Sequence, residues 1–321
     1  MRTVLLATAL AAFVAMSVAA IRSFPTEDTG DINWPLLATI GIAGPTLTIW
    51  LNAAEFDAQA RLLAVHVSRA AALRVSVLGT AANLLPLPGA VLVRTQALAR
   101  DGVGYAAAGG IAVVAAITWL GATAFAAGLG VLLLGGFVIG PLCVATGVVL
   151  CVVGLLLCQR FPGGTVRAWT LLFAVELGLT VMAALRLLVI LIALGLDVEP
   201  GQALAMTIAG ALASATGIFP AGLGLREALT ALVASLVSLD AAAGFAAAAA
   251  DRIAGLVVLF VASAAIIAVR RFGQPATASY NSTPPPSGVL ERSTSSTPSD
   301  SRRSRIASRS SGDSQPGNPS L

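Results

Sequence analysis

Apolar runs of about 20 residues recur along the chain, and they constrain its fold more than any other feature. At ~1.5 Å per residue, a helical run of this length crosses the ~30 Å hydrocarbon layer of a bilayer. Backbone polar groups need internal partners inside a bilayer, so such spans are helices. The sequence therefore predicts an all-α, polytopic membrane protein. The six predicted spans are residues 3–21, 34–51, 103–126, 138–157, 168–194 and 241–269.

The composition agrees with this fold class. Hydrophobic residues make up 57% of the 321 residues, charged residues make up only 11%, and the mean hydropathy is +0.90. Soluble domains carry about 25% charged residues. The chain has Arg but no Lys, which together with its many Ala residues is typical of a GC-rich bacterial genome. We therefore expect a multi-pass protein of a bacterial cytoplasmic membrane.

The net charge of +4 belongs to the end of the chain. Residues 1–269 contain twelve Arg and twelve acidic residues, whereas residues 270–321 contain seven Arg and three acidic residues. We predict a membrane domain over residues 1–271 and a disordered, basic, Ser/Pro/Arg-rich cytoplasmic tail over residues 272–321. An excess of positive charge that is confined to a tail does not predict nucleic acid as a partner.

Two further apolar segments are each interrupted by proline and glycine. Residues 71–85 and 90–99 flank the first interruption, and residues 203–219 and 225–239 flank the second. Proline lacks an amide donor and glycine favours turns, so a helix ends at each interruption. We predict two re-entrant helical hairpins, with eight transmembrane helices as the alternative. The predicted hairpin breaks are Pro86, Pro88, Gly89, Pro220, Gly222 and Gly224.

The order span, span, hairpin, span occurs twice, with an offset of about 134 residues that places Pro86 on Pro220. The predicted repeat halves are residues 1–130 and 131–271, to within a few residues. Each half has three crossings, so the second half is predicted to be inverted relative to the first, as in many transporters. The alternative interpretation of residues 3–21 is a cleaved signal peptide. The repeat favours a transmembrane helix that is not cleaved, because the first half needs this helix as its first crossing.

Arginine placement predicts the orientation, because cytoplasmic loops carry an excess of basic residues. Arg160, Arg167 and the tail are expected on the cytoplasmic side, and the acidic loops near residues 27–31 and 197–199 on the outside. Both termini are then cytoplasmic, provided that the first hairpin returns to the side from which it enters.

Six charged residues fall where hydrocarbon is expected, and each costs at least about 2.5–3.5 kcal/mol at a helix centre when unpaired. They are Arg94, Glu176, Arg226, Glu227, Asp251 and Arg252. Their charges sum to zero, so a structural network of ion pairs is one interpretation. The other is a site where the arginines receive an anionic headgroup, since guanidinium donates two bonds to phosphate at once. Arg186 lies late in its span and is expected to extend toward the interface. Residues 52–74, which carry Glu55 and Asp57 beside Arg61, Arg69 and Arg74, are likewise expected to lie at the interface.

No other chemistry is indicated. Cys143, Cys151 and Cys158 share one helix face and are interpreted as small packing residues. His66 is the only histidine, which leaves too few ligands for a usual zinc site. No Gly-rich phosphate loop and no Ser/His/Asp set is present, so we predict no catalytic residue, no metal and no cofactor.

The segment from Pro220 through Arg226 and Glu227, followed by Asp251-Arg252, resembles the second signature of the flippase-like membrane domain family. That family includes the transmembrane region of lysylphosphatidylglycerol synthases. The segment from Asn83 through Gly89 to Arg94 resembles its first signature, and the resemblance covers about residues 3–270. Two positions depart from the family pattern. Ala90 stands where the family usually has an acid, and Thr118-Trp119 where it often has an acid-Arg pair.

The resemblance implies a stand-alone member without the soluble aminoacyl-transfer domain. It also implies translocation of a lipid or lipid-linked sugar between leaflets, with an anionic membrane lipid as partner. Two alternatives remain open. One is a membrane-embedded transferase acting on a polyprenyl-phosphate lipid. The other is a non-catalytic scaffold for an envelope-biosynthesis enzyme, with the basic tail as docking arm.

Overall fold

The computed structural model describes residues 32–83, 89–100, 102–216 and 224–272 of the chain. Within these ranges every regular element is a helix. Five of the helices are long and apolar enough to cross a membrane. They are α2 (Trp34–Leu62), α5 (Tyr105–Leu133), α6 (Ile139–Cys158), α7 (Val166–Ala193) and α10 (Ala241–Phe272). These helices confirm the prediction of an α-helical, multi-pass membrane protein.

The five long helices correspond to five of the six predicted spans. The sixth predicted span, residues 3–21, lies outside the described residues, as do residues 273–321 of the predicted tail. Local sequence explains several helix ends. The side chains of Asn33 and Thr165 cap α2 and α7 by accepting from the backbone N–H groups three residues on. Gly135 and Gly195, just beyond α5 and α7, have positive φ angles that favour glycine.

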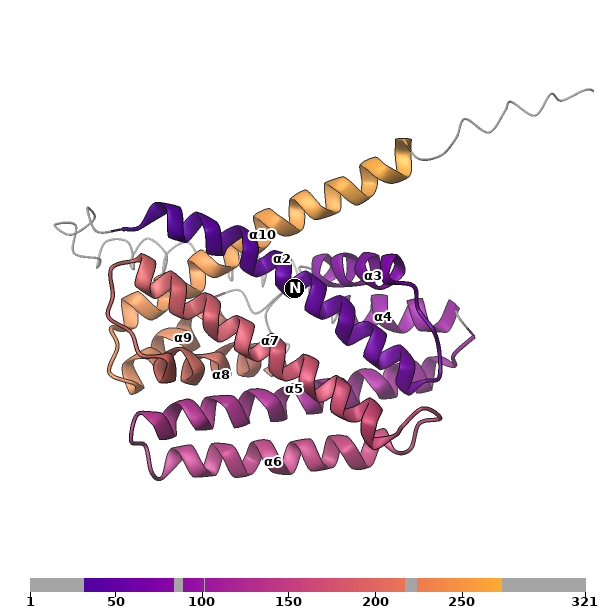
Figure 1. The fold of residues 1–321 in the computed structure, drawn as a ribbon, viewed down its shortest axis with the longest axis horizontal. Helices are drawn as coiled ribbons and strands as arrows, with labels where there is room; N and C mark the ends of the chain where they lie inside the picture. Colours follow the sequence, from indigo (N-terminus) through magenta and orange to yellow (C-terminus); the bar gives the residue numbers. More distant parts are fainter. Residues whose placement is uncertain (1–31, 84–88, 101, 217–223, 273–321) are drawn as a thin grey trace, which may run out of the picture. The chain divides into compact units, whose positions relative to one another are not determined.

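Four shorter helices form two neighbouring pairs. Helix α3 (Arg69–Ala82) packs on α4 (Gly89–Arg100), and α8 (Pro200–Thr216) packs on α9 (Leu225–Leu236) (Figure 1). They contain 12 to 17 residues, so at ~1.5 Å per residue each falls short of a ~30 Å crossing. The breaks predicted at Pro86, Pro88, Pro220 and Gly222 lie outside the described residues.

The other two predicted break residues are described, and both need to be glycine. A Cβ on Gly89 would lie 2.1 Å from the carbonyl oxygen of Ala82, so only glycine permits α3 and α4 to approach so closely. Gly224 precedes α9 with φ of +78°, a conformation that side chains with a Cβ rarely adopt. These two glycines therefore mark in the sequence where the second helix of each pair, α4 and α9, begins.

Helices α5 and α6 pack along each other through small residues (Figure 1). Cβ atoms on Gly121 and Gly128 of α5 would lie within 3.0 Å of backbone or side-chain atoms of α6. Close approach at glycines is a common way for helices to pack in membranes. Cys151 lies at the first contact and Cys143 at the second, and all three cysteines are free thiols. The geometry at these two cysteines supports the packing interpretation.

The expectation that residues 52–74 lie at the interface is wrong for its first part. Helix α2 continues without a break to Leu62 and buries Glu55 and Gln59. The reason is that both polar side chains find partners inside the helix assembly. With 29 residues, α2 is about 43 Å long and exceeds the hydrocarbon thickness.

Candidate functional site

A polar pocket of about 450 Å³ lies among the helices of the membrane domain. Every described helix except α6 contributes at least one residue to its lining. A volume of this size is typical of small-molecule sites, which range over about 300–1,000 Å³. The charged residues that line it are Glu55, Arg94, Glu176, Arg186, Arg226 and Arg252. An apolar membrane domain therefore encloses an unusually charged interior.

Helix α2 lines the pocket with a polar stripe. Thr48, Asn52, Glu55 and Gln59 follow one another at spacings of four, three and four residues. Residues spaced in this way lie on one face of an α-helix. Helix α7 contributes Glu176 and, ten residues later, Arg186. At ~1.5 Å per residue these two α7 positions are about 15 Å apart along the helix axis.

The first group of ions, the Glu55 cluster, consists of Glu55, Arg94 and Glu176. Arg94 donates through Nη1 and Nη2 to the two carboxylate oxygens of Glu55, with Nη2 at 2.8 Å from Oε2. Gln59 Nε2 donates to Glu55 Oε1 at 2.6 Å. Glu176 lines the same pocket as Glu55 and Arg94. This part of the pocket therefore carries two carboxyl groups and one guanidinium.

Glu176 is the member of this cluster whose side chain makes the fewest hydrogen bonds. Its residue is 2% exposed and lines the polar pocket. Its Oε1 atom makes no hydrogen bond to any described residue. One turn later, Thr180 donates to the backbone carbonyl of Glu176 at 3.0 Å and pairs with Thr123 of α5 at 3.1 Å. These contacts fix the α7 backbone around Glu176 but do not involve its carboxyl group.

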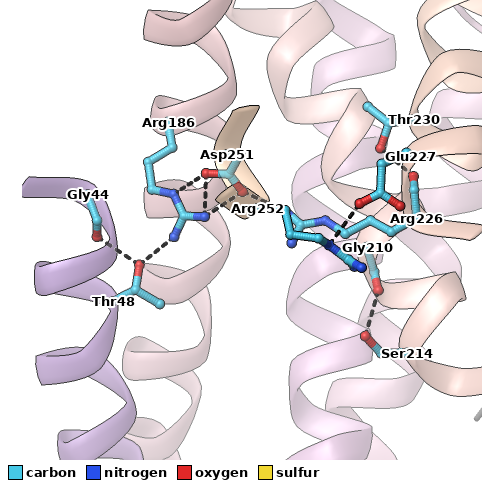
Figure 2. Close-up of polar contacts among 10 residues, drawn as sticks. All are labelled: Gly44, Thr48, Arg186, Gly210, Ser214, Arg226, Glu227, Thr230, Asp251 and Arg252. Atoms are coloured by element: carbon cyan, nitrogen blue, oxygen red, sulfur yellow. Dashed lines mark hydrogen bonds and ion pairs between the residues drawn. The ribbon is translucent and has the colours of Figure 1, made fainter. Parts of the chain in front are cut away.

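The second group, the Asp251 cluster, consists of Arg186, Arg226, Glu227, Asp251 and Arg252 (Figure 2). Asp251 accepts from two guanidinium groups. Arg186 donates Nε to Oδ1 at 2.6 Å and Nη2 to Oδ2, and Arg226 donates Nη2 to Oδ2 at 2.9 Å. Glu227 forms an ion pair with Arg252, whose Nε lies 2.8 Å from Glu227 Oε1. Helices α7, α9 and α10 are thereby tied together inside the domain.

Two further contacts connect this cluster to α2. Arg186 Nη1 donates to the hydroxyl of Thr48 at 2.8 Å, and that hydroxyl donates to the carbonyl of Gly44 at 3.0 Å (Figure 2). A Cβ on Gly44 would lie 2.6 Å from both Cγ and Cδ of Arg186. The missing side chain at Gly44 therefore makes room for the arginine stem to reach Asp251.

The structure brings the six predicted charges into one region. Arg226, Glu227, Asp251 and Arg252 share the Asp251 cluster, and Arg94 and Glu176 share the Glu55 cluster. Four of the six also line the pocket itself, namely Arg94, Glu176, Arg226 and Arg252. Glu227 and Asp251 are almost fully buried and are not among the lining residues. They pair with arginines that line the pocket.

Two members of the site were not predicted. Arg186 was expected to extend toward the interface, but it is 8% exposed and bonded to Asp251, because a buried carboxylate and the space at Gly44 accommodate it. Glu55 was assigned to an interfacial stretch. The spacing of Thr48, Asn52 and Glu55 along one helix face was the signal that would have placed Glu55 inside.

The charges of the two clusters are complementary. With all groups ionised, the Glu55 cluster carries two acids and one arginine, a net charge of −1. The Asp251 cluster carries three arginines and two acids, a net charge of +1. The pocket thus has an anionic end and a cationic end in an otherwise neutral interior. Among the described residues, no group of three or more His, Cys, Asp and Glu side chains is placed to hold a metal ion.

Comparison of the chain with family models, curated proteins and solved structures finds no match. The resemblance carried by the two Pro/Gly segments therefore stays a prediction. The residues of the pocket are what supports a functional proposal.

Proposed function

We propose that this membrane protein translocates a lipid or a lipid-linked sugar with an anionic, phosphate-containing headgroup between the leaflets of a bacterial cytoplasmic membrane. The observation that carries the proposal is the pocket itself. Four arginines line about 450 Å³ of space inside a domain whose helices α6 and α10 expose many large apolar side chains. Such a domain offers a polar path for a headgroup while lipid tails remain against apolar helix surfaces.

The Asp251 cluster is suited to receive a phosphate group. It carries one positive charge in excess, which equals the single negative charge of a phosphodiester. Guanidinium groups bind phosphate oxygens through paired, charge-assisted hydrogen bonds. The cationic end of the pocket therefore complements the headgroup in both charge and hydrogen-bond type.

Arg226 is the residue we assign as the headgroup contact. Its side chain is 28% exposed, against 10% for Arg186 and 9% for Arg252. A headgroup that draws Arg226 away leaves Asp251 still paired with Arg186. Binding then leaves no buried charge without a partner. An unpaired buried charge is the usual energetic cost of opening a buried ion pair.

The two short helix pairs fit this role as re-entrant hairpins. Arg94 lies on α4 and Arg226 on α9, so the second helix of each pair brings one arginine to the pocket. We propose six crossings in an inverted repeat, with both termini cytoplasmic, so that the hairpins enter from opposite sides. The resemblance to the flippase-like membrane domain family supports the same architecture.

The proposal is tested with purified full-length protein reconstituted into liposomes that contain fluorescent phosphatidylglycerol in both leaflets. A membrane-impermeant reductant bleaches the outer leaflet at once and reports the rate at which inner-leaflet probe arrives. We expect the protein to accelerate arrival, and Arg226→Ala to slow it about ten- to a hundredfold. Hydrogen bonds to charged groups contribute about 1.5–3 kcal/mol, which corresponds to that range.

Arg69→Ala is the matched control, because Arg69 is exposed at the start of α3 and does not line the pocket. A second set of liposomes carries a labelled polyprenyl phosphate to represent lipid carriers of sugars. If the protein moves neither probe faster than empty liposomes, or if Arg226→Ala is as fast as Arg69→Ala, the proposal is wrong. Chemical turnover of the polyprenyl phosphate would instead assign the pocket to a transferase.

A further inference from the structure

The described helices contact one another in a pattern that occurs twice. Helix α2 packs on α3 as α7 packs on α8, and α4 packs on α5 as α9 packs on α10. Between the two halves, α5 packs on α8 as α10 packs on α3. Helix α5 therefore corresponds to α10, as expected from the predicted repeat. Helix α6, which packs along α5, corresponds in that repeat to residues 3–21, which lie outside the described residues (Figure 1).

The burial of single residues gives the register between α5 and α10. Four buried positions have the same spacing in the two helices. They are Ile111, Val114, Ala115 and Thr118 of α5, and Gly244, Ala247, Ala248 and Asp251 of α10. The next residue, Trp119 in α5 and Arg252 in α10, lines the pocket in both helices. The offset in this register is one residue smaller than the offset between the prolines of the two breaks.

The two helices differ in how the residues that follow are covered. In this register Ala254 corresponds to Gly121. Val261 corresponds to Gly128, and it is 62% exposed although Gly128 is buried against α6. Within the most apolar stretch of each helix, 56% of the α5 residues are buried against 6% of the α10 residues. None of the described helices therefore covers α10 at Val261 as α6 covers α5.

We propose that residues 3–21 form a transmembrane helix that packs along the face of α10 marked by Ala254 and Val261, antiparallel to α10, as α6 packs along α5. The segment contains 19 uncharged residues, so at ~1.5 Å per residue it reaches about 28 Å. Seven of these residues are alanine, and small residues permit helices to approach closely in lipid. The proposal concerns the fold and does not depend on what the pocket transports.

The connection to α2 is compatible with this place. Helix α2 reaches α10 at Gly41, where a Cβ would lie 3.3 Å from Cβ of Ala254. Trp34, at the start of α2, precedes Gly41 by seven residues, which is about 10 Å along the helix. Residues 22–33 can extend to about 40 Å. The end of the segment at residue 21 can therefore lie beside α10, close to the point at which α2 meets it.

A helix at this place supports the ion pairs of the pocket. Asp251 lies one turn before Ala254 on α10. The rotation of α10 about its axis decides whether Asp251 reaches Arg186 and Arg226, with which it pairs. A helix packed along the second half of α10 restricts that rotation. Residues 3–21 thereby hold the Asp251 cluster in place without contacting it.

Disulfide cross-linking tests the placement in membranes that contain the full-length protein with its three native cysteines replaced by alanine. Val261→Cys is combined with Thr8→Cys, Ala9→Cys, Leu10→Cys or Ala11→Cys, which together cover one helical turn. Ala9 is the counterpart of Cys143, whose Cβ would lie 2.9 Å from a Cβ on Gly128. After oxidation, the chain is cut at a protease site inserted between residues 22 and 31. Non-reducing electrophoresis then shows whether the two parts remain joined.

We expect a cross-link from Val261→Cys to one or two of the four positions. Ser263→Cys is the matched control, because it lies two residues further and about 160° away around α10. It should not cross-link to any of the four. Ala254→Cys with Ser17→Cys, the counterparts of Gly121 and Cys151, provides a second pair if a Val261→Cys variant does not elute like the wild type in size-exclusion chromatography.

Four results would overturn the inference. They are no cross-link in either set of pairs, equal cross-linking by Ser263→Cys, a cross-link that forms only between two chains, and an intact mass that lacks about the first 20 residues. The third result would assign the α10 face to a second copy of the protein, and the fourth would identify residues 3–21 as a cleaved signal peptide. A cross-link within one chain supports the placement even if no lipid moves in liposomes.

Discussion

Arg186 and Asp251, which are 65 residues apart in the sequence, join α7 to α10 through a two-point contact inside the membrane domain. Nε and Nη2 of the arginine donate to the two carboxylate oxygens, and Nη1 donates to Thr48 of α2. One guanidinium therefore connects three helices. Paired geometry of this kind is the strongest form of charge-assisted hydrogen bonding. Variants at this contact and at Arg226 can therefore distinguish the contribution of these ion pairs to stability from their proposed contribution to headgroup binding.

Asp251→Asn is expected to destabilise the protein strongly. The substitution removes the charge that neutralises Arg186 and leaves a buried guanidinium unpaired, which costs about 3–5 kcal/mol. Thermal unfolding of purified protein in detergent measures the loss as a lower midpoint. Asp57→Asn is the matched control, because its pair with Arg61 is more exposed and such pairs contribute about 1 kcal/mol or less. Equal losses in the two variants would contradict the structural role of Asp251.

Gly44→Ala tests the space through which Arg186 reaches Asp251. The added Cβ would lie 2.6 Å from Cγ and Cδ of Arg186, so the arginine stem must shift and weaken its bonds to Thr48 and Asp251. Overpacking of this kind costs about 1–3 kcal/mol. Gly109→Ala on α5 is the control, because a Cβ there meets nothing within 4 Å and alanine favours a helix. The prediction is wrong if both variants unfold at the same temperature.

The hairpin topology predicts which side of the membrane each connection faces. Ser68 precedes α3 and Tyr105 begins α5, so cysteines at these positions should react with an impermeant thiol reagent from the same side. Glu199→Cys and Asp240→Cys, which flank α8 and α9, should react from the opposite side. The measurement uses right-side-out and inverted vesicles from a variant whose three native cysteines are replaced by alanine.

The side of reaction separates the two topologies. If Ser68→Cys and Tyr105→Cys react from opposite sides, residues 69–100 form a single broken crossing. The eight-helix alternative is correct if Glu199→Cys and Asp240→Cys also react from sides opposite to each other. The background without native cysteines must first be shown to elute like the wild type, because Cys143 and Cys151 lie at the contact between α5 and α6. An unlabelled background is the blank for every position.

The sequence predicts the helices of this protein well and its ion pairs only in part. Apolar length identifies a span without knowledge of its neighbours, and Gly89 and Gly224 mark helix starts through local backbone geometry. Pairing depends on how each helix is rotated about its axis, which no local pattern fixes. Arg186 was therefore assigned to the interface although its partner Asp251 was already recognised as buried. Glu55 escaped notice because α2 was ended too early.

Arg226→Ala is expected to separate function from stability. Asp251 retains Arg186 when Arg226 is removed, so the loss of stability should stay below about 1 kcal/mol, as for a partly exposed pair. Phosphate binding at the cationic end should nevertheless weaken, because the cluster falls from one excess positive charge to none. The unfolding midpoint in detergent measures the first effect. Stabilisation by a short-chain phosphatidylglycerol, compared with short-chain phosphatidylcholine, measures the second.

Arg186→Ala gives the opposite pattern and serves as the comparison for Arg226→Ala. It leaves Asp251 with Arg226 alone and removes the link to Thr48, so the unfolding midpoint should fall even without lipid. The wild type should gain more from the anionic lipid than from the zwitterionic one, because mass action stabilises whichever state binds ligand. Arg226→Ala should lose that difference while keeping its midpoint. If Arg226→Ala lowers the unfolding midpoint as much as Arg186→Ala does, the two arginines have the same structural role. Arg226 is then not available to bind a headgroup.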